Sequence, residues 1–333
     1  MMDAAELHAD ALVWDQTFPA TPTCGSWASH FGALERMKAS GYDVVSITVA
    51  SDPDDTMSAI RRIAMWRRYI DENADRYVLL TKAGDAQAAK QAGKLALGFG
   101  FQGTNPFERD IGLIQVFYKL GVRHALMAYN QKNHVGDGCH ERTDCGLSRF
   151  GVDLVREMQR VGMLVDCTHT GRRTSLDVFE MATAPVIYSH SNAAALKSHE
   201  RNIGDDLARA CAATGGVIGV NGIGIFLGDN DDSTDALFAH LDHWVELVGI
   251  EHVGIGLDSV SDPATLTAAV HRQATKFPAG QGYEVEQMRV CTPEQIPQLT
   301  ERMVAAGYGE DAIRAVLGGN WLRLARDVWK EIA

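Results

Sequence analysis

The sequence predicts a (β/α)8 barrel, and three observations support this fold class. Eight short apolar segments rich in β-branched residues recur along the chain, and segments with helical periodicity separate most of them. Apolar runs without alternation are typical of parallel strands that are buried on both faces. A barrel of this kind also accommodates 333 residues in one domain. We therefore expect a single α/β domain over residues 1–333.

The order of the segments supports the barrel. The eight predicted strands lie at residues 10–14, 43–50, 94–101, 124–130, 163–169, 185–190, 216–223 and 252–258. Helical patterns occupy residues 55–75, 108–121, 149–162, 171–182, 202–216 and 234–249, and several of them end at a glycine, which is typical of a helix C-cap. Two C-terminal helices are expected near 293–306 and 309–331. A doubly wound open sheet is the rival fold, but no glycine-rich dinucleotide motif follows the first strand.

The segment at about 261–292 interrupts the repeat after the eighth strand. Because barrel active sites lie at the carboxyl ends of the strands, a long connection at this point is well placed to cover such a site. We interpret the segment as an active-site insertion or lid.

Composition limits the classes of partner. Hydrophobic residues make up 46% and charged residues 22% of the chain, as in an ordinary protein with a substantial core. The formal net charge of -12 argues against nucleic acid and anionic membranes as partners, so a small-molecule substrate is expected. No apolar run is long enough to span a bilayer, the N-terminal segment does not resemble a signal peptide, and the six cysteines show no regular spacing. These features predict a cytoplasmic protein with reduced thiols. A homodimer is compatible with the sequence, which does not decide the oligomeric state.

Polar residues near the predicted strand ends indicate a metal site. His8 and Asp10 are two residues apart in "HAD", which we place on the first strand, where both side chains would point to the same side. His169, His190 and Asp258 end the fifth, sixth and eighth strands. Imidazole and carboxylate groups that converge at one rim suit Zn²⁺ or a similar divalent ion. Each signal alone also fits a hydrogen-bonded core residue, but four strands with such residues at one end favour a metal centre.

Several motifs resemble those of the membrane dipeptidase (renal dipeptidase, peptidase M19) family of the amidohydrolase superfamily. They are "HAD", "GFGFQG", "GMLVDCTHTG", "APVIYSHSNA", "HERNIGDD", "GIGLD" and "LGGNWLRL", in this order over essentially the whole chain. The resemblance implies a barrel with a binuclear zinc centre that hydrolyses dipeptides, often with a D-residue at the second position. It also implies that His8 and Asp10 hold the first metal, and that His169 and His190 hold the second.

The same resemblance assigns two further roles. Arg201 in "HERN" would bind the substrate carboxylate, and Asp258 would shuttle the proton. A guanidinium can bind a carboxylate through two parallel hydrogen bonds, which suits this role for Arg201. The alternative for Arg201 is a surface ion pair with Asp205 or Asp206.

The sequence departs from the family pattern at two positions. Gln102 stands where the family has a glutamate that bridges both metals, and Tyr129 stands where the family has a histidine that stabilises the tetrahedral intermediate. A neutral amide has one good acceptor oxygen, so we expect one or two zinc ions, with the second site weakened. On this basis Gln102→Glu should raise the metal stoichiometry toward two. Tyr129 can donate one hydrogen bond to an oxyanion or to a substrate, although an aromatic residue that only lines the rim is an equal alternative.

Three functions remain open at this stage. The first is a zinc-dependent dipeptidase that uses a metal-activated water. The second is an amidohydrolase of another small substrate, such as an N-acyl amino acid, a lactone or a cyclic amide. The third is a catalytically impaired binding protein.

Overall fold

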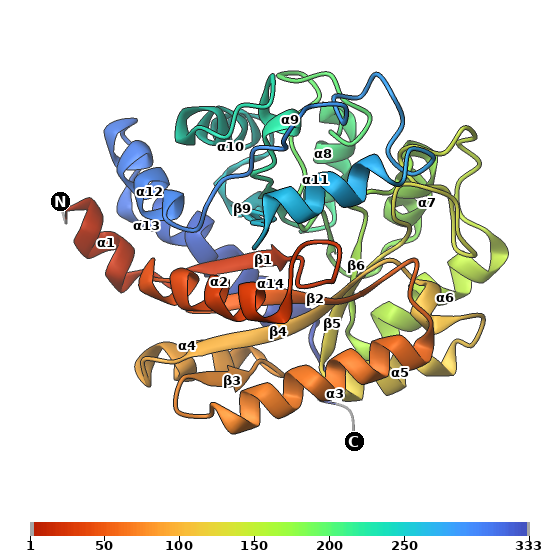
Figure 1. Cartoon of the computed structure of the whole chain (residues 1–333), viewed down its shortest axis with the longest axis horizontal. Helices are drawn as coiled ribbons and strands as arrows, with labels where there is room; N and C mark the ends of the chain where they lie inside the picture. Colours follow the sequence, from red (N-terminus) through yellow and green to blue (C-terminus); the bar gives the residue numbers. More distant parts are fainter. Residues whose placement is uncertain (1–2, 332–333) are drawn as a thin grey trace.

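The chain folds as a closed barrel of eight parallel strands, which confirms the predicted fold class. The computed structural model describes residues 3–331 (Figure 1). The barrel strands are β1 (Trp14–Phe18), β2 (Val44–Ser51), β4 (Leu95–Gln102), β5 (Val122–Leu126), β6 (Leu164–Asp166), β7 (Val186–Ile187), β8 (Ile218–Val220) and β9 (Val253–Ile255). Their order is β7-β6-β5-β4-β2-β1-β9-β8, and a parallel bridge between Tyr188 and Ile218 joins the two ends of this series.

One additional strand lies outside the barrel. The short strand β3 (Tyr77–Leu79) pairs in parallel with Leu95–Leu97 at the start of β4. The later part of β4 pairs with β5 instead. The barrel is therefore closed by eight strands, as predicted, and β3 lies outside this ring, where it pairs only with the start of β4.

Helices surround the strands (Figure 1). The α-helices before the insertion are α1 (Ala4–Asp10), α2 (Trp27–Ala39), α3 (Thr56–Glu72), α4 (Ala83–Gln91), α5 (Gly112–Lys119), α6 (Arg149–Val161), α7 (Arg172–Met181), α8 (Asp205–Ala213), α9 (Gly224–Leu227) and α10 (Thr234–Val248). Within and after the insertion lie α11 (Pro263–His271), α12 (Gln295–Ala305), α13 (Glu310–Arg314) and α14 (Asn320–Val328). Short 3-10 turns cover Asn105–Phe107 and Ile250–His252.

Local sequence explains where several helices begin and end. Helix α6 begins after Ser148, whose hydroxyl accepts a hydrogen bond from the Gly151 amide at 2.9 Å. It ends at Gly162, which has the left-handed conformation (φ 90°) that glycine adopts without strain. Helix α10 is capped in the same way by Ser233. These helices match the segments predicted from periodicity.

The helix expected over 309–331 is interrupted by a π-helical turn at Ala315–Gly319. A Cβ atom on Gly318 would lie 2.4 Å from the carbonyl oxygen of Leu12, so glycine is required for this close approach to the chain just before β1. The wider turn thus packs the C-terminal helices against the start of the barrel.

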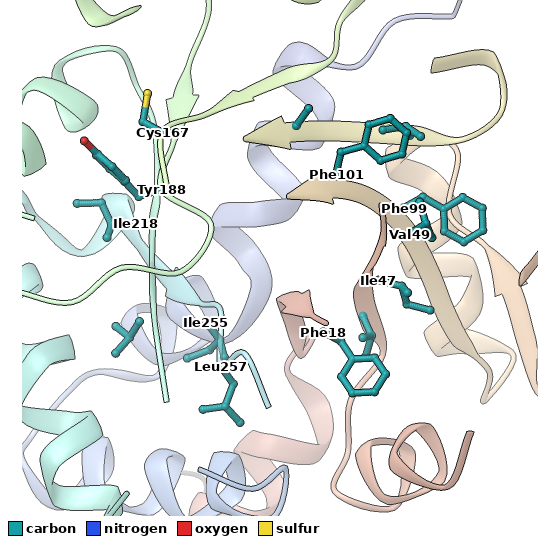
Figure 2. Close-up of a cluster of buried hydrophobic side chains, with 14 of the residues drawn as sticks. Phe18, Ile47, Val49, Phe99, Phe101, Cys167, Tyr188, Ile218, Ile255 and Leu257 are labelled. Atoms are coloured by element: carbon teal, nitrogen blue, oxygen red, sulfur yellow. The ribbon is translucent and has the colours of Figure 1, made fainter. Parts of the chain in front are cut away.

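An apolar core packs the barrel strands against the surrounding helices, whereas the inside of the barrel is partly polar, because Gln16 of β1 bonds there to His124 of β5 and to Ser46 of β2. Figure 2 shows side chains from several strands in one cluster, including Phe18, Ile47, Phe99, Tyr188 and Ile255, and all of these are buried. Helix residues complete this cluster, since the ring of Phe101 on β4 lies 4.9 Å from that of Phe117 on α5. The packed core fixes the strand ends on which the polar residues lie.

The prediction for the first strand was wrong. His8 and Asp10 lie in α1, which begins after Asp3, whose carboxylate accepts a hydrogen bond from the Glu6 amide. The first strand starts only at Trp14. The apolar run at residues 11–14 leads into the strand, and the preceding capped turn favours a helix, so the "HAD" motif is not on the barrel.

The segment after β9 begins with α11 and continues to an antiparallel bridge between Ile223 and Val290. Its apolar side chains pack with Ile225 and Phe226 of α9 into a separate buried cluster. In residues 3–331, no helix is both long and apolar enough to cross a membrane. The cytoplasmic location and the homodimer remain predictions.

Candidate active site

Polar side chains gather where the barrel strands end. Gln102 is the last residue of β4, and Tyr129, His169, His190 and Asp258 follow β5, β6, β7 and β9 within a few residues. Because these strands are parallel, their carboxyl ends meet at one rim. A cavity of about 90 Å³ is lined by Gln102, Tyr129 and Asp258, and a neighbouring hollow is lined by His169 and Arg201.

Two imidazoles face each other at this rim. The Nε2 atoms of His169 and His190 are 3.2 Å apart. The Nδ1 atom of His169 donates to the Asn130 side-chain oxygen at 2.6 Å, which leaves its Nε2 as an acceptor. The Nδ1 atom of His190 lies 2.7 Å from the Ser189 hydroxyl and 3.0 Å from the Thr17 hydroxyl. Both rings are therefore held in a fixed orientation.

The two imidazoles are neutral. Burial, followed by the positive charge of Arg201, holds the pKa of both His169 and His190 well below the ordinary value. Neutral imidazole is the form that binds a metal ion. His169 also has a positive φ of 62°, a conformation that is strained for residues other than glycine and that often occurs at functional sites.

Asp258 is a buried carboxyl group. Burial raises its pKa to about 7, although Arg201 and a hydrogen bond from Asn221 lower it in part. The Asn221 amide donates to Oδ2 of Asp258 at 3.1 Å, and the φ of Asp258 is 56°. A carboxyl group with a pKa near neutrality can both accept and release a proton during a reaction.

Arg201 is almost fully buried, with 2% of its surface exposed. Its Nη1 donates to the Ser191 hydroxyl and its Nη2 to the His190 carbonyl, whereas Nε has no partner. Arg201 forms no ion pair with any residue in 3–331, because Asp205 and Asp206 pair with His243 and Arg172 instead. The surface ion pair considered from the sequence is therefore wrong. A buried guanidinium without a carboxylate indicates an anionic ligand.

Tyr129 lies directly beside the imidazole pair. Its ring stacks on that of His169, with centroids 4.0 Å apart and an interplanar angle of 23°. The ammonium of Lys276, from the insertion, lies 4.2 Å from the centroid of the same ring. Tyr129 thus separates Lys276 from His169.

The residues do not fit a two-metal centre. In residues 3–331, no group of three or more His, Cys, Asp or Glu side chains is arranged to hold a metal ion. Strand β1 presents Thr17 to His190, and the buried Asp15 accepts hydrogen bonds from the amides of Thr17 and Leu257. Gln102 is neutral, and its buried Nε2 has no partner among the described residues.

The structure does not bring His8 and Asp10 to this rim. His8 bonds through Nδ1 to the Thr300 hydroxyl at 2.9 Å and through Nε2 to the Ser40 carbonyl at 2.9 Å, which ties α1 to α12 and to the end of α2. Asp10 is exposed and pairs with Arg314. Their assignment as metal ligands is corrected, because they precede the barrel.

A single ion remains compatible with the donor set. Two imidazole nitrogens about 2.0 to 2.1 Å from one tetrahedral zinc ion lie roughly 3.3 to 3.4 Å apart, close to the observed separation. Hydrogen bonds to the second nitrogen of each ring, as His169 and His190 have, are typical of metal-binding histidines.

Sequence reasoning missed Thr17, Asn130 and Lys276. Thr17 was missed because the first strand was placed too early. Asn130 directly follows Tyr129, so its position after the same strand could have identified it. Lys276 lies in an insertion that carries no periodic pattern. Only the fold shows that its side chain reaches the rim.

Imidazole, carboxyl and guanidinium groups gather at the carboxyl-terminal rim of this parallel barrel, which is where barrel enzymes have their active sites. A family model described as membrane dipeptidase (peptidase family M19) matches residues 3–271. The chain belongs to this family.

Individual relatives agree with this family. An uncharacterized dipeptidase of Schizosaccharomyces pombe is 33% identical over 207 residues, which cover 60% of this chain and 50% of that protein. The chain thus spans about half the length of this relative. An amidohydrolase from Pseudomonas aeruginosa has a similar structure, with a TM-score of 0.89, 32% identity and coverage of 99% and 100% of the two chains.

A metallo peptidase from Rhodobacter sphaeroides, solved with a phosphinate mimic of the dipeptide L-Ala-D-Ala, has the same fold. The TM-score is 0.79 at 20% identity, and 96% of this chain and 100% of that chain are covered.

Proposed function

We propose that the protein hydrolyses the amide bond of dipeptides, or of closely related small amides, that carry a free C-terminal carboxylate. The observation that carries this proposal is the buried Arg201, which has no carboxylate partner among the described residues and lies at the same rim as Asp258. Membership of the M19 family supports the dipeptide as substrate class. The ligand of the Rhodobacter peptidase makes L-Ala-D-Ala the first dipeptide to assay, in line with a D-residue at the C-terminal position.

Each residue has a role in this proposal. Arg201 binds the substrate carboxylate and thereby places the scissile bond next to Asp258. Asp258 accepts a proton from the attacking water and transfers it to the leaving amine, as its pKa of about 7 allows. The Tyr129 hydroxyl donates a hydrogen bond to the oxyanion that develops on the carbonyl oxygen, and burial, which raises its pKa, keeps this hydroxyl protonated.

We propose that His169 and His190 hold one divalent ion, and imidazole ligands favour zinc. When bound, such an ion would polarise the carbonyl group and acidify a water molecule. Gln102 can contribute its amide oxygen to this ion, while its Nε2, which has no partner among the described residues, stays available as a donor.

A second candidate is a binding protein that retains the pocket without hydrolysis. The small number of metal-ligand side chains at the rim favours it. A third, hydrolysis of a different small amide or lactone, follows from the neutral Gln102 and from Tyr129.

One experiment separates these candidates. The native protein and Asp258→Asn are assayed with L- and D-terminated dipeptides, N-acyl amino acids and lactones, before and after chelation and with zinc restored. We expect dipeptide hydrolysis that is lost on chelation, returns with zinc and is absent in Asp258→Asn. Hydrolysis of none of these substrates by the zinc-loaded protein would contradict the proposal in favour of the binding protein.

A further inference from the structure

Lys276 reaches the candidate site from the insertion. The carbonyl oxygens of Thr275 and Lys276 accept hydrogen bonds from the side chains of Gln131 (3.0 Å) and Asn130 (3.2 Å). The side-chain oxygen of Asn130 also accepts a hydrogen bond from Nδ1 of His169, so one amide joins the insertion to the imidazole pair. These contacts hold the Lys276 backbone beside Tyr129.

The ammonium of Lys276 has no carboxylate partner among the described residues. Its nitrogen lies over the Tyr129 ring at 4.2 Å from the centroid. Because His169 stacks on this ring at 4.0 Å, the ammonium and the imidazole must lie on opposite faces. Burial lowers the pKa of Lys276, and Asp52 and Asp54 offset this only in part.

The two nearby carboxylates already have other partners. Asp52 accepts hydrogen bonds from the amides of Tyr129 and Thr104 and from the side chain of Asn133. Asp54 forms an ion pair with Arg62. Neither carboxylate lies within ion-pair distance of Lys276, whose charge is directed to the cavity side of Tyr129.

The cavity that Lys276 lines has a mixed wall, in which the only carboxyl group among the lining residues is that of Asp258, whose pKa burial raises to about 7. Neutral polar side chains also line it, and among them Nε2 of Gln102 is buried without a partner among the described residues. Residues such as Val260, Leu266, Val270 and Phe277 form the apolar part of the wall. A cation and an unpartnered neutral donor in a small buried cavity suit a carboxylate, since a charge-assisted hydrogen bond is strong there.

We propose that this cavity binds a second acidic group of the substrate through Lys276, with Gln102 as an additional donor. The inference rests on the proposed function, because the first acidic group is the carboxylate at Arg201. It narrows the substrate class to small amides with two carboxylates, such as dipeptides that contain an acidic residue. Gln102 then donates a hydrogen bond to a carboxylate that a glutamate at position 102 would repel.

The test compares glutamate with glutamine, which has the same shape and one carboxylate fewer. Both are titrated, as L and D enantiomers, into the native protein and into Lys276→Met, Lys276→Arg and Arg272→Met. Arg272 is an exposed cation of the same segment and serves as the matched control. Calorimetry measures binding without any need for turnover.

We expect one enantiomer of glutamate to bind the native protein about tenfold or more tightly than the matching glutamine. Lys276→Met should reduce this ratio to about one and leave glutamine binding unchanged, whereas Lys276→Arg and Arg272→Met should keep most of it. Equal affinities in the native protein, or a preference that survives Lys276→Met, would overturn the inference.

Hydrolysis of Gly-Glu and Gly-Gln, with both enantiomers of the second residue, separates the two proposals. Cleavage of both dipeptides at equal rates, without a preference for glutamate in binding, would contradict the site for a second acidic group and leave the proposed hydrolysis intact. A preference for glutamate in binding that depends on Lys276, without cleavage of any dipeptide, would contradict the proposed hydrolysis and leave the site for a second acidic group intact.

Discussion

The two halves of the barrel rim differ in what they offer a metal ion. At the ends of β6 and β7, His169 and His190 are neutral, oriented by hydrogen bonds and 3.2 Å apart. At the ends of β1 and β4, the corresponding positions carry Thr17, which bonds to His190, and the neutral Gln102. One half can hold an ion and the other mainly donates hydrogen bonds. We propose that this barrel keeps its acid–base group and one half of a metal site, while the other half donates hydrogen bonds.

The largest effect is expected for Asp258→Asn. Loss of the proton acceptor should lower kcat/KM about 10²- to 10⁴-fold, since general acid–base groups contribute on this scale. Thermal unfolding checks that the variant is folded. Retention of more than a tenth of the native rate would remove Asp258 from the proposed mechanism.

The pH dependence of the native enzyme tests the same group. Burial raises the pKa of Asp258 to about 7, so below this pH the carboxyl is protonated and cannot accept a proton. We expect kcat/KM to rise with pH and to level off above about 7. A rate that stays constant between pH 5 and 8 contradicts this assignment.

Arg201→Ala should have the next largest effect. Removal of the guanidinium should cost on the order of 2 to 4 kcal/mol in transition-state binding of substrates with a free carboxylate. Substrates with an amidated C-terminus provide the control, because they lack the group that Arg201 binds. If the native enzyme cleaves free and amidated substrates equally well, Arg201 has a different role.

Gln102→Glu should strengthen metal binding at the rim. An added carboxylate beside two imidazoles should raise the affinity for zinc about tenfold or more, since it supplies a charged ligand. Because β1 supplies no imidazole, we now expect the stoichiometry to approach one rather than two. Gln273→Glu, which adds the same charge to the same cavity from the insertion, is the matched control. Equal gains in both variants would show a general charge effect.

The smallest effects are expected for His8 and Asp10 of the "HAD" motif, which lies in α1 and not on the barrel. His8→Ala removes two hydrogen bonds, one of them buried, and should lower the free energy of unfolding by about 1 to 3 kcal/mol without a change in zinc affinity. Asp10→Ala removes an exposed ion pair and should change stability by less than about 1 kcal/mol. Loss of zinc binding in either variant would show that the residue is a metal ligand after all.

The sequence predicted the barrel because strands buried on both faces leave long apolar runs, as in β2 and β4. It placed His169, His190 and Asp258 at strand ends for the same reason. The first strand was misplaced because residues 11–14 are apolar without being part of a regular strand. The prediction put "HAD", which precedes these residues, on the first strand, whereas "DQT", which follows them, lies in β1.

The remaining site residues depend on long-range contacts. Lys276 reaches Tyr129 across 147 positions of sequence, and Thr17 reaches His190 across 173. No local pattern specifies such pairs. The π-helical turn near Gly318 likewise depends on contact with Leu12 rather than on helix propensity.

The zinc content of the purified protein tests the central claim most directly. The native protein and His169→Ala are equilibrated with excess zinc, passed through a desalting column, and analysed for metal per chain. We predict no more than one zinc ion per native chain and none in His169→Ala. Two tightly held ions per native chain would contradict a rim in which only one half binds metal.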